Sequence, residues 1–321
     1  MANGRTRDLE GTLVALVGGS GFFGTHLAQE LLSRGARVRV CSRHPERAFR
    51  LKPLGGLGQT QFVAVDVTKP GTLAKALVGV DAVVNLVGAF AGDLDSIQGA
   101  GAGRIAEAAR DAGARAFVHV SALGADAGSD VAYARTKAEG EAAVQAAFPA
   151  ATIVRPSILF GEDDTFLNMF GALMSKLPVL PVFGPAAKLQ PVFVDDAAEA
   201  VANALAGSDS HGGKTYELAG PEVMTMGDLN RRIAGAAGRS PVLVELPDPV
   251  SGAIAALTGW LPGAPISNDQ WKLLKAGNIA SGTVPGIDAL GVQARPLGLF
   301  LDRWMTRYRK FGRFGARAKS A

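Results

Sequence analysis

The sequence predicts an α/β fold with a doubly wound parallel sheet and a smaller C-terminal α/β lobe. Short runs of β-branched residues alternate with alanine-rich stretches through the first half of the chain, which is the pattern of a parallel sheet covered by helices. Hydrophobic residues make up 48% of the 321 residues and 41 residues are glycine, which suits close packing of helices on a sheet. Three of these glycines lie between the first expected strand and the first expected helix.

The boundaries of the elements follow from these runs. The expected strands are Leu13–Val17, Arg37–Cys41, Phe62–Val65, Ala82–Leu86, Ala116–Val120 and Ala151–Val154. The clearest helices are Phe22–Arg34, Leu73–Leu77, Ala102–Ala112 and Val131–Ala147. After residue 156 the alternation loosens. We therefore expect residues 11–160 to form the first domain, with 187–206 returning to it, and residues 161–186 and 207–321 to form the smaller lobe.

The composition excludes several classes of protein. A single cysteine, Cys41, rules out a disulfide framework and a cysteine-rich metal site, and the four histidines are scattered, so we expect no metal. The N-terminus has no apolar signal-peptide core, and the apolar stretch Val250–Leu261 is shorter than the roughly 20 residues that span a bilayer. These features predict a cytoplasmic protein.

The glycines after the first strand predict a dinucleotide site. Gly18, Gly21 and Gly24 lie between an apolar strand and an amphipathic helix. Glycine lets the turn tighten and lets backbone approach a pyrophosphate, and the helix N-terminus supplies free N–H groups and a positive dipole. The alternative is a merely tight β-α turn. The further strands at the expected intervals favour a Rossmann-type domain that binds a nicotinamide dinucleotide.

The residues after the second and third strands bear on the choice of cofactor. In NAD-binding domains an acidic residue at the end of the second strand binds the adenosine ribose, but here Arg43 follows that strand. A guanidinium can pair with a 2′-phosphate, which favours NADP(H) over NAD(H). Arg43 could instead only solvate the strand end, with Arg39 or Arg47 contributing. Asp66 is placed to accept from the adenine amino group, or is an ordinary strand-ending aspartate.

Several motifs together resemble the extended short-chain dehydrogenase/reductase superfamily. They are GGSGFFG at 18–24, Ala64–Val67, Asn85–Gly88, Val120–Ala122 and Tyr133–Lys137. Four further segments are similar to the NAD(P)-binding accessory subunit family of respiratory complex I: Tyr133–Glu141, Ala151–Asp164, Gln190–Asp196 and Gly213–Glu222. The resemblance covers roughly residues 12 to 245.

This resemblance implies a set of cofactor contacts and a location. The implied cofactor-binding residues are Gly18, Ser20, Gly21, Phe22, Phe23, Gly24, Arg43, Asp66, Val67, Leu86, Val87, Gly88, Tyr133, Lys137 and Pro156. The family implies NADP(H) held mainly for structure, stability or assembly, with peripheral-arm subunits of complex I near the membrane as partners. The location would be the inner face of a bacterial inner membrane, or the matrix side in mitochondria.

The candidate catalytic residues leave catalysis open. Tyr133 and Lys137 have the spacing at which a lysine holds the nicotinamide ribose and helps the phenol to pass a proton, but the same contacts can hold a ribose without reaction. The third member, a serine or threonine that binds the substrate oxygen, falls at or next to Ala122, with Ser121 one residue early. A methyl group cannot stabilise an oxyanion. The alternative function is a free-standing NADP(H)-dependent reductase or epimerase/dehydratase acting on a small molecule or a quinone.

The C-terminal segment predicts an amphipathic basic helix. Apolar residues recur at helical spacing, namely Leu297, Leu301, Trp304, Tyr308 and Phe311. Residues 303–321 carry seven basic and no acidic side chains, whereas the whole chain has a net charge of +4. This segment suits an anionic lipid surface or an acidic partner, or a terminal helix docked on its own domain. Nothing accompanies the charge that would indicate nucleic-acid binding.

Overall fold

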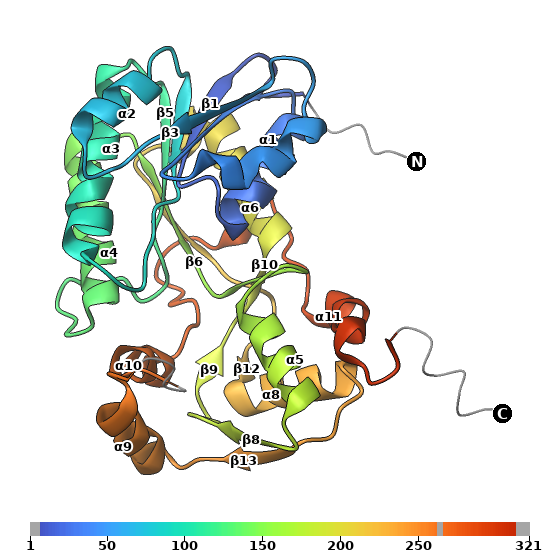
Figure 1. Cartoon of the computed structure of the whole chain (residues 1–321). Helices are drawn as coiled ribbons and strands as arrows, with labels where there is room; N and C mark the ends of the chain where they lie inside the picture. The colour runs from blue at the N-terminus through green and yellow to red at the C-terminus, as the bar shows by residue number, and fades with distance from the viewer. Residues whose placement is uncertain (1–6, 262–265, 313–321) are drawn as a thin grey trace. The chain divides into compact units, whose positions relative to one another are not determined.

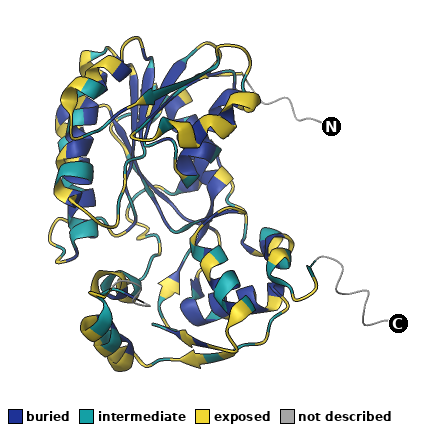
Figure 2. Ribbon diagram, in the orientation of Figure 1, coloured by how far each residue is buried: buried dark blue, intermediate teal, exposed yellow. Residues whose placement is uncertain are grey.

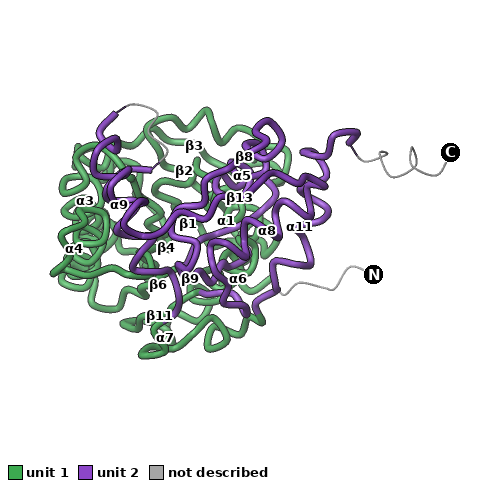
Figure 3. Tube along the Cα trace, turned by 90° about the horizontal axis from the view of Figure 1, so that it is seen from below, with its two compact units in different colours: residues 1–156, 194–218, 281–293 green, residues 157–193, 219–280, 294–321 purple. Residues whose placement is uncertain are grey.

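The computed structural model describes residues 7–261 and 266–312, which fall into two compact units (Figure 3). Unit 1 comprises residues 1–156, 194–218 and 281–293, and unit 2 comprises 157–193, 219–280 and 294–321. Within the described residues, no helix has both the length and the apolar character needed to cross a membrane.

Unit 1 contains a seven-stranded parallel sheet. Its strands are β1 (Leu13–Val17), β2 (Arg37–Ser42), β3 (Thr60–Ala64), β4 (Ala82–Asn85), β5 (Ala116–Val120), β6 (Thr152–Pro156) and β11 (Thr215–Leu218). Their order is β11-β6-β5-β4-β1-β2-β3, so the chain winds outward in both directions from β1 and β4. In such sheets a crevice forms outside the carboxyl ends of the strands at this reversal, and ligands bind there.

Helices cover both faces of this sheet (Figure 1). The helices of unit 1 are α1 (Phe22–Ser33), α2 (Pro70–Ala76), α3 (Ala100–Asp111), α4 (Ala132–Ala147), α6 (Val194–Ala206) and α7 (Ser208–His211). The helices α2, α3 and α4 pack on one face, where Ala15 and Phe117 belong to their common core. The helices α1 and α6 pack together on the opposite face. Figure 2 shows the strands as a buried layer between them, and this arrangement confirms the predicted doubly wound fold.

The sheet extends further than the sequence indicates. We expected residues 207–321 in the smaller lobe, but β11 pairs in parallel with β6, with Thr215 opposite Ile153. The segment Ser281–Gln293 also belongs to unit 1. Residues 187–193, expected to return to the first domain, instead lie in unit 2, and the return begins at Val194. These short segments carry no helical or long apolar signal of their own, so pairing with distant residues decides where they belong.

Unit 2 is built from three two-stranded sheets and flanking helices. Its strands pair as β7 (Leu159–Phe160) with β10 (Val192–Phe193), β8 (Val179–Val182) with β13 (Val242–Glu245), and β9 (Lys188–Leu189) with β12 (Met224–Thr225). Its helices are α5 (Phe166–Lys176), α8 (Met226–Ala236), α9 (Asp248–Thr258), α10 (Asn268–Ala276) and α11 (Gly298–Trp304). Helices α8 and α10 each begin with a capping box, which satisfies N–H groups that a helix start leaves unpaired.

The C-terminal segment is shorter and less regular than a single amphipathic helix. After α11 the chain continues as a 3₁₀ turn over Met305–Tyr308. Its apolar stripe is covered by unit 2 itself, because Leu301 and Trp304 are buried and the Tyr308 hydroxyl donates a hydrogen bond to Asn168 Oδ1 at 2.8 Å. Most of the apolar face is therefore docked on its own unit, as the last of the three interpretations expects, whereas Phe311 is exposed. The basic residues after 312 lie outside the described residues.

Candidate dinucleotide site

The three glycines at the start of α1 differ in what a side chain would meet there. Gly18 has a φ of +88°, and a Cβ there would lie 3.0 Å from the carbonyl carbon of Leu86. A Cβ on Gly24 would lie 2.6 Å from the Cα of Gly19, so this glycine lets α1 pack on the loop. A Cβ on Gly21 would instead meet only the Gly18 carbonyl oxygen, at 3.7 Å.

Gly21 is therefore the glycine that the protein's own packing does not require. It is exposed and is the N-cap of α1, with no side chain capping the helix. The first N–H groups of a helix have no acceptor inside the helix, and here they belong to Phe22, Phe23 and Gly24, beside Ser20. An exposed helix start of this kind attracts phosphate.

The end of β2 carries a cation that forms no hydrogen bond within the described residues. Arg43 is exposed, and none of the hydrogen bonds or salt bridges found among the described residues involves its guanidinium. Arg39, one of the two alternatives to Arg43, is tied to the protein: it donates to Gln61 at 2.7 Å and to the Ala76 carbonyl at 2.6 Å. The buried hydroxyl of Ser42, next to Arg43, has no hydrogen-bond partner among the described residues.

Asp66, after β3, is held as an ionised acceptor. Its Oδ1 accepts from the Thr68 backbone N–H at 3.0 Å and from the Thr68 hydroxyl at 2.7 Å. These bonds lower the pKa of the Asp66 carboxyl, with a smaller contribution from the positive charges of Lys69 and Arg43. The carboxylate keeps further acceptor capacity, so Asp66 and the adjacent Val67 can still meet a ligand.

The loop after β4 lies between the glycine loop and α4. The Leu86 N–H donates to the Val17 carbonyl at 2.8 Å, and the Val87 N–H to the Asn85 side chain at 3.0 Å. A Cβ on Gly88 would lie 3.4 Å from Lys137 Nζ. The three residues Leu86, Val87 and Gly88 thus border both the phosphate end and the lysine end of the crevice.

Lys137 is a buried ammonium with spare hydrogen-bonding capacity. Its Nζ donates to the Val120 carbonyl at 3.1 Å and to the Val87 carbonyl at 3.4 Å. Burial lowers the pKa of Lys137 to about 8, which the Glu141 carboxylate partly opposes, so most of the amine is protonated at pH 7. An ammonium has three donors, and the hydrogen bonds found among the described residues use two of them.

Tyr133 lies one helical turn before Lys137 on α4. Burial raises the pKa of its phenol to about 12, which makes it a poor proton donor compared with a free tyrosine. The ring of Phe90 is stacked on it, with centroids 4.6 Å apart and planes 12° apart. Phe90 was not expected from the sequence. It lies two residues after the Asn85–Gly88 motif, but no periodicity indicates that it meets α4.

Strand alternation assigns Ser121 and Ala122 to different faces. The Ser121 N–H donates to the Val154 carbonyl at 2.8 Å, which continues the pairing of β5 with β6. Ser121 therefore points to the same face as Phe117 and His119, the face that α4 covers. Lys137 lies near enough to His119 to lower its pKa, although burial is the larger cause.

The Ser121 hydroxyl is nevertheless sealed inside the protein. It is buried and has no hydrogen-bond partner among the described residues. Ala122, partly exposed at the strand end, presents only a methyl group to a ligand. The structure thus brings Tyr133 and Lys137 together on one helix, but it offers no accessible hydroxyl at either position 121 or 122.

Pro156 closes the site region at the end of β6. It is buried, and its carbonyl accepts from the Leu123 N–H at 3.0 Å. The preceding Arg155 forms two hydrogen bonds to the Glu141 carboxylate on α4, at 2.8 and 2.6 Å. This pair fixes α4 against β6, and with it the turn that carries Lys137.

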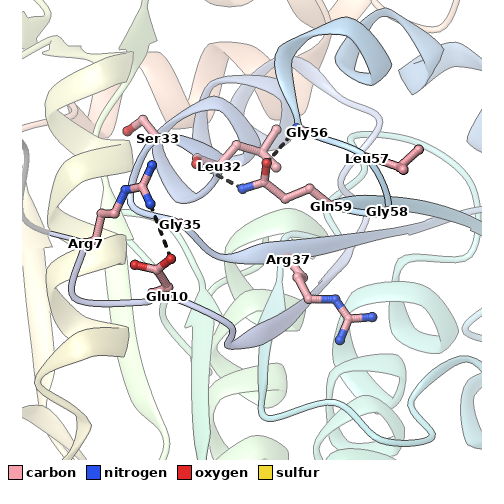
Figure 4. Close-up of a pocket in the computed structure, with 10 residues that line it drawn as sticks. All are labelled: Arg7, Glu10, Leu32, Ser33, Gly35, Arg37, Gly56, Leu57, Gly58 and Gln59. Atoms are coloured by element: carbon pink, nitrogen blue, oxygen red, sulfur yellow. Dashed lines mark hydrogen bonds and ion pairs between the residues drawn. The ribbon is translucent and has the colours of Figure 1, made fainter.

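A separate hollow of about 350 Å³ lies elsewhere in unit 1 (Figure 4). It is lined by Arg7, Glu10, Leu32, Ser33, Gly35, Arg37 and residues 56–59. These residues precede β1, β2 and β3, so the hollow lies at the amino ends of the strands and not at the crevice. Among the described residues, no cluster of histidine, cysteine, aspartate or glutamate could hold a metal ion.

Comparison with known proteins supports this picture. A family described as NAD(P)H-binding matches residues 18–172, and one described as RmlD substrate binding domain matches residues 127–256. NADH dehydrogenase [ubiquinone] 1 alpha subcomplex subunit 9 from Rattus norvegicus is 32% identical over 96% of this chain and 83% of its own length. The Arabidopsis thaliana protein of the same name is 32% identical over 96% of this chain and 81% of its own length. The chain belongs to this family.

Three further proteins are similar to this chain. A ceramide reductase from Caulobacter vibrioides is 32% identical over 74% of each chain. Among solved structures, a nucleoside-diphosphate-sugar epimerase from Staphylococcus aureus has a TM-score of 0.71 at 15% identity, covering 91% of this chain and 100% of its own. The dTDP-glucose 4,6-dehydratase from Streptomyces venezuelae has a TM-score of 0.68 at 21% identity, covering 95% of this chain and 98% of its own. These likenesses confirm the Rossmann-type fold.

Proposed function

We propose that this protein is an NADP(H)-binding accessory subunit of complex I, in which the dinucleotide is held mainly for structure, stability or assembly. The observation that supports the binding site is the glycine at position 21. The fold leaves room for a side chain there, whereas a phosphate bound at the start of α1 would clash with one. Membership of the subunit 9 family over 96% of the chain supports the assignment to complex I.

The residues present fit a dinucleotide along its whole length. The pyrophosphate would lie on the N–H groups at the start of α1, and Asp66 with Val67 would receive the adenine. Tyr133 and Lys137 would bind the nicotinamide ribose, with Leu86–Gly88 and Pro156 bordering the ring. When bound, the cofactor supplies the capacity to donate or accept a hydride.

The preference for NADP(H) rests on the end of β2. Arg43 is exposed and its guanidinium is not engaged by the fold, while Arg39 is engaged. A 2′-phosphate would give Arg43 a partner for charge-assisted hydrogen bonds. The hydroxyl of the neighbouring Ser42 also lacks a hydrogen-bond partner among the described residues.

A structural role for the cofactor follows from the state of the catalytic candidates. The Ser121 hydroxyl is sealed, Ala122 cannot bind an oxyanion, and the pKa of Tyr133 is raised to about 12. The two residues that would orient a ribose, Tyr133 and Lys137, are both present. We further propose that the partners are subunits of the peripheral arm near the membrane, with the protein at its cytoplasmic or matrix side, and that exposed basic residues near the C-terminus face anionic lipid.

Two measurements test this proposal. The dinucleotide released from the purified protein by denaturation identifies the cofactor. Membranes solubilised in mild detergent should yield this chain together with NADH:quinone reductase activity. A chain that remains wholly apart from that activity, with the enzyme fully assembled and active in its absence, would contradict the subunit assignment.

A second candidate function is reduction of a lipid carbonyl. The Caulobacter relative is named as a ceramide reductase, and the Tyr133–Lys137 pair that such chemistry uses is present. The test is oxidation of NADPH in the presence of a ceramide that carries a ketone, the group a hydride can reduce. Turnover that Tyr133→Phe abolishes while binding persists would favour this function over the first.

A further inference from the structure

Phe90 combines high exposure with a fixed position. Its side chain is 75% exposed, yet one face of its ring lies parallel to the ring of Tyr133 at 4.6 Å. Exposed single aromatic residues are common and need no explanation. This one differs because its contact is with the residue that is the candidate ribose ligand.

A buried glutamine holds the two residues in this arrangement. Gln98 is 1% exposed, and its Oε1 accepts from the backbone N–H of Ala89, directly before Phe90, at 3.0 Å. Its Nε2 donates to the Thr136 hydroxyl at 2.8 Å and to the Tyr133 carbonyl at 3.5 Å. One side chain therefore ties the loop after β4 to the turn of α4 that carries Tyr133.

A second tie acts at the other end of this loop. Lys137 Nζ donates to the Val87 carbonyl, so residues 87 and 89 are both hydrogen-bonded to side chains that lie against or on α4. The backbone on the N-terminal side of Phe90 is thus restrained next to the turn of α4 that carries Tyr133, and the stacked contact forms without burial of Phe90 itself.

We propose that Phe90 is a shielding residue for Tyr133: its ring excludes water from one face of the phenol. The proposal rests on the proposed function, in which Tyr133 binds a ribose and does not transfer a proton. Contact with an aromatic face, which carries partial negative charge, also disfavours a phenolate. This fits the raised pKa of Tyr133, for which burial is the cause.

The test is the rate at which Tyr133 is nitrated by tetranitromethane, which reacts with the phenolate. Peptide mapping by mass spectrometry separates the three tyrosines, so Tyr216 and Tyr308 serve as internal references in the same sample. Phe90→Ala should raise nitration of Tyr133 by about tenfold for each unit by which its pKa falls. Phe90→Trp, which restores a flat ring, should return the rate toward that of the wild type.

Phe49→Ala is the matched control. Phe49 is also an exposed phenylalanine of unit 1 in contact with another ring, that of Phe62, and its removal should leave Tyr133 unchanged. If Phe90→Ala loses the folded circular-dichroism spectrum, Phe90→Leu keeps apolar bulk without a ring and should give an intermediate rate. Equal nitration of Tyr133 in the wild type and in the folded Phe90 variants would overturn the proposal.

The result can be separated from that for the proposed function. Saturating NADP(H) should protect Tyr133 from nitration in the wild type and in Phe90→Ala. Absence of any dinucleotide binding would refute the proposed function, whereas the ratio of the rates without ligand would still decide whether Phe90 shields the phenol.

Discussion

Replacing Gly21 by alanine separates a dinucleotide site from a merely tight β-α turn. Gly21 has a φ of −78° and a ψ of −179°, an extended conformation that alanine adopts without strain. The added Cβ would meet its nearest neighbour at 3.7 Å, which is ordinary van der Waals contact. A turn that serves only the fold would therefore accept this substitution.

The expected effects differ strongly between stability and binding. A glycine replaced by alanine in a compatible conformation changes stability by about 0.4–1 kcal/mol in the favourable direction, because the unfolded chain loses freedom. For binding, the methyl group would displace a phosphate from the N–H groups of α1. Loss of one hydrogen bond to a charged group costs about 1.5–3 kcal/mol, which corresponds to a dissociation constant roughly ten- to a hundredfold weaker.

The assay is calorimetric titration with NADPH alongside urea unfolding of the same samples. Gly24→Ala is the opposite control, since its Cβ would lie 2.6 Å from the Gly19 backbone and should destabilise the fold. If Gly21→Ala binds NADPH as tightly as the wild type, the phosphate does not approach this loop and the steric reasoning fails. If it unfolds as readily as Gly24→Ala, the loop is a packing element only.

Other predictions concern selectivity, pH and the C-terminal segment. Arg43→Ala should weaken NADPH binding by more than about tenfold, the equivalent of 1.4 kcal/mol, and leave NADH binding unchanged. Arg37→Ala, at the opposite end of β2, is the control, and equal loss for both cofactors would refute a 2′-phosphate contact. The affinity for NADPH should fall above pH 8, because Lys137, with a pKa of about 8, loses its charge there. Lys137→Met has no such charge, so its affinities for NADPH at pH 7 and pH 9 should be equal. Deleting residues 303–321 should lower the free energy of unfolding, because Trp304 and Tyr308 pack on the rest of unit 2. At temperatures where the protein stays folded, NADPH affinity should be unchanged, and a loss of affinity would show that the segment supports the site.

The burial of Lys137 also makes stability depend on pH. Its pKa is lowered from 10.5 to about 8 in the folded protein, so between these values the unfolded state holds a proton that the folded state has released. Stability should therefore rise with pH across that interval. A thermal melt of Lys137→Met, which has no such proton, should lack this rise.

The strands of the sheet were predictable because their information is local. Strands β1, β4 and β5 lie between layers of helices, so they appear in the sequence as short continuous apolar runs. The glycines at 18 and 24 could likewise be placed, since each answers a local steric requirement of the turn and the helix start. β11 was not found in the sheet because its four residues acquire a role only by pairing with β6, some sixty residues earlier.

The C-terminal stripe shows a different limit of sequence reasoning. Apolar spacing correctly identified Leu301, Trp304 and Tyr308 as one face. The spacing does not indicate what covers that face, because binding to a membrane, to a partner or to the protein's own lobe requires the same apolar pattern. The hydrogen bond from Tyr308 to Asn168 shows that the lobe itself is the partner for most of the stripe, whereas Phe311 stays 67% exposed.

The catalytic question turns on features that motif spacing does not record. Tyr133 and Lys137 have the spacing of a working pair, but reactivity depends on their surroundings. A proton donor needs a pKa near the working pH, and the pKa of the Tyr133 phenol, on whose ring Phe90 is stacked, is raised to about 12. Lys137 keeps a donor for a ribose hydroxyl. Holding a cofactor needs only the lysine and a neutral phenol, and both are present on α4.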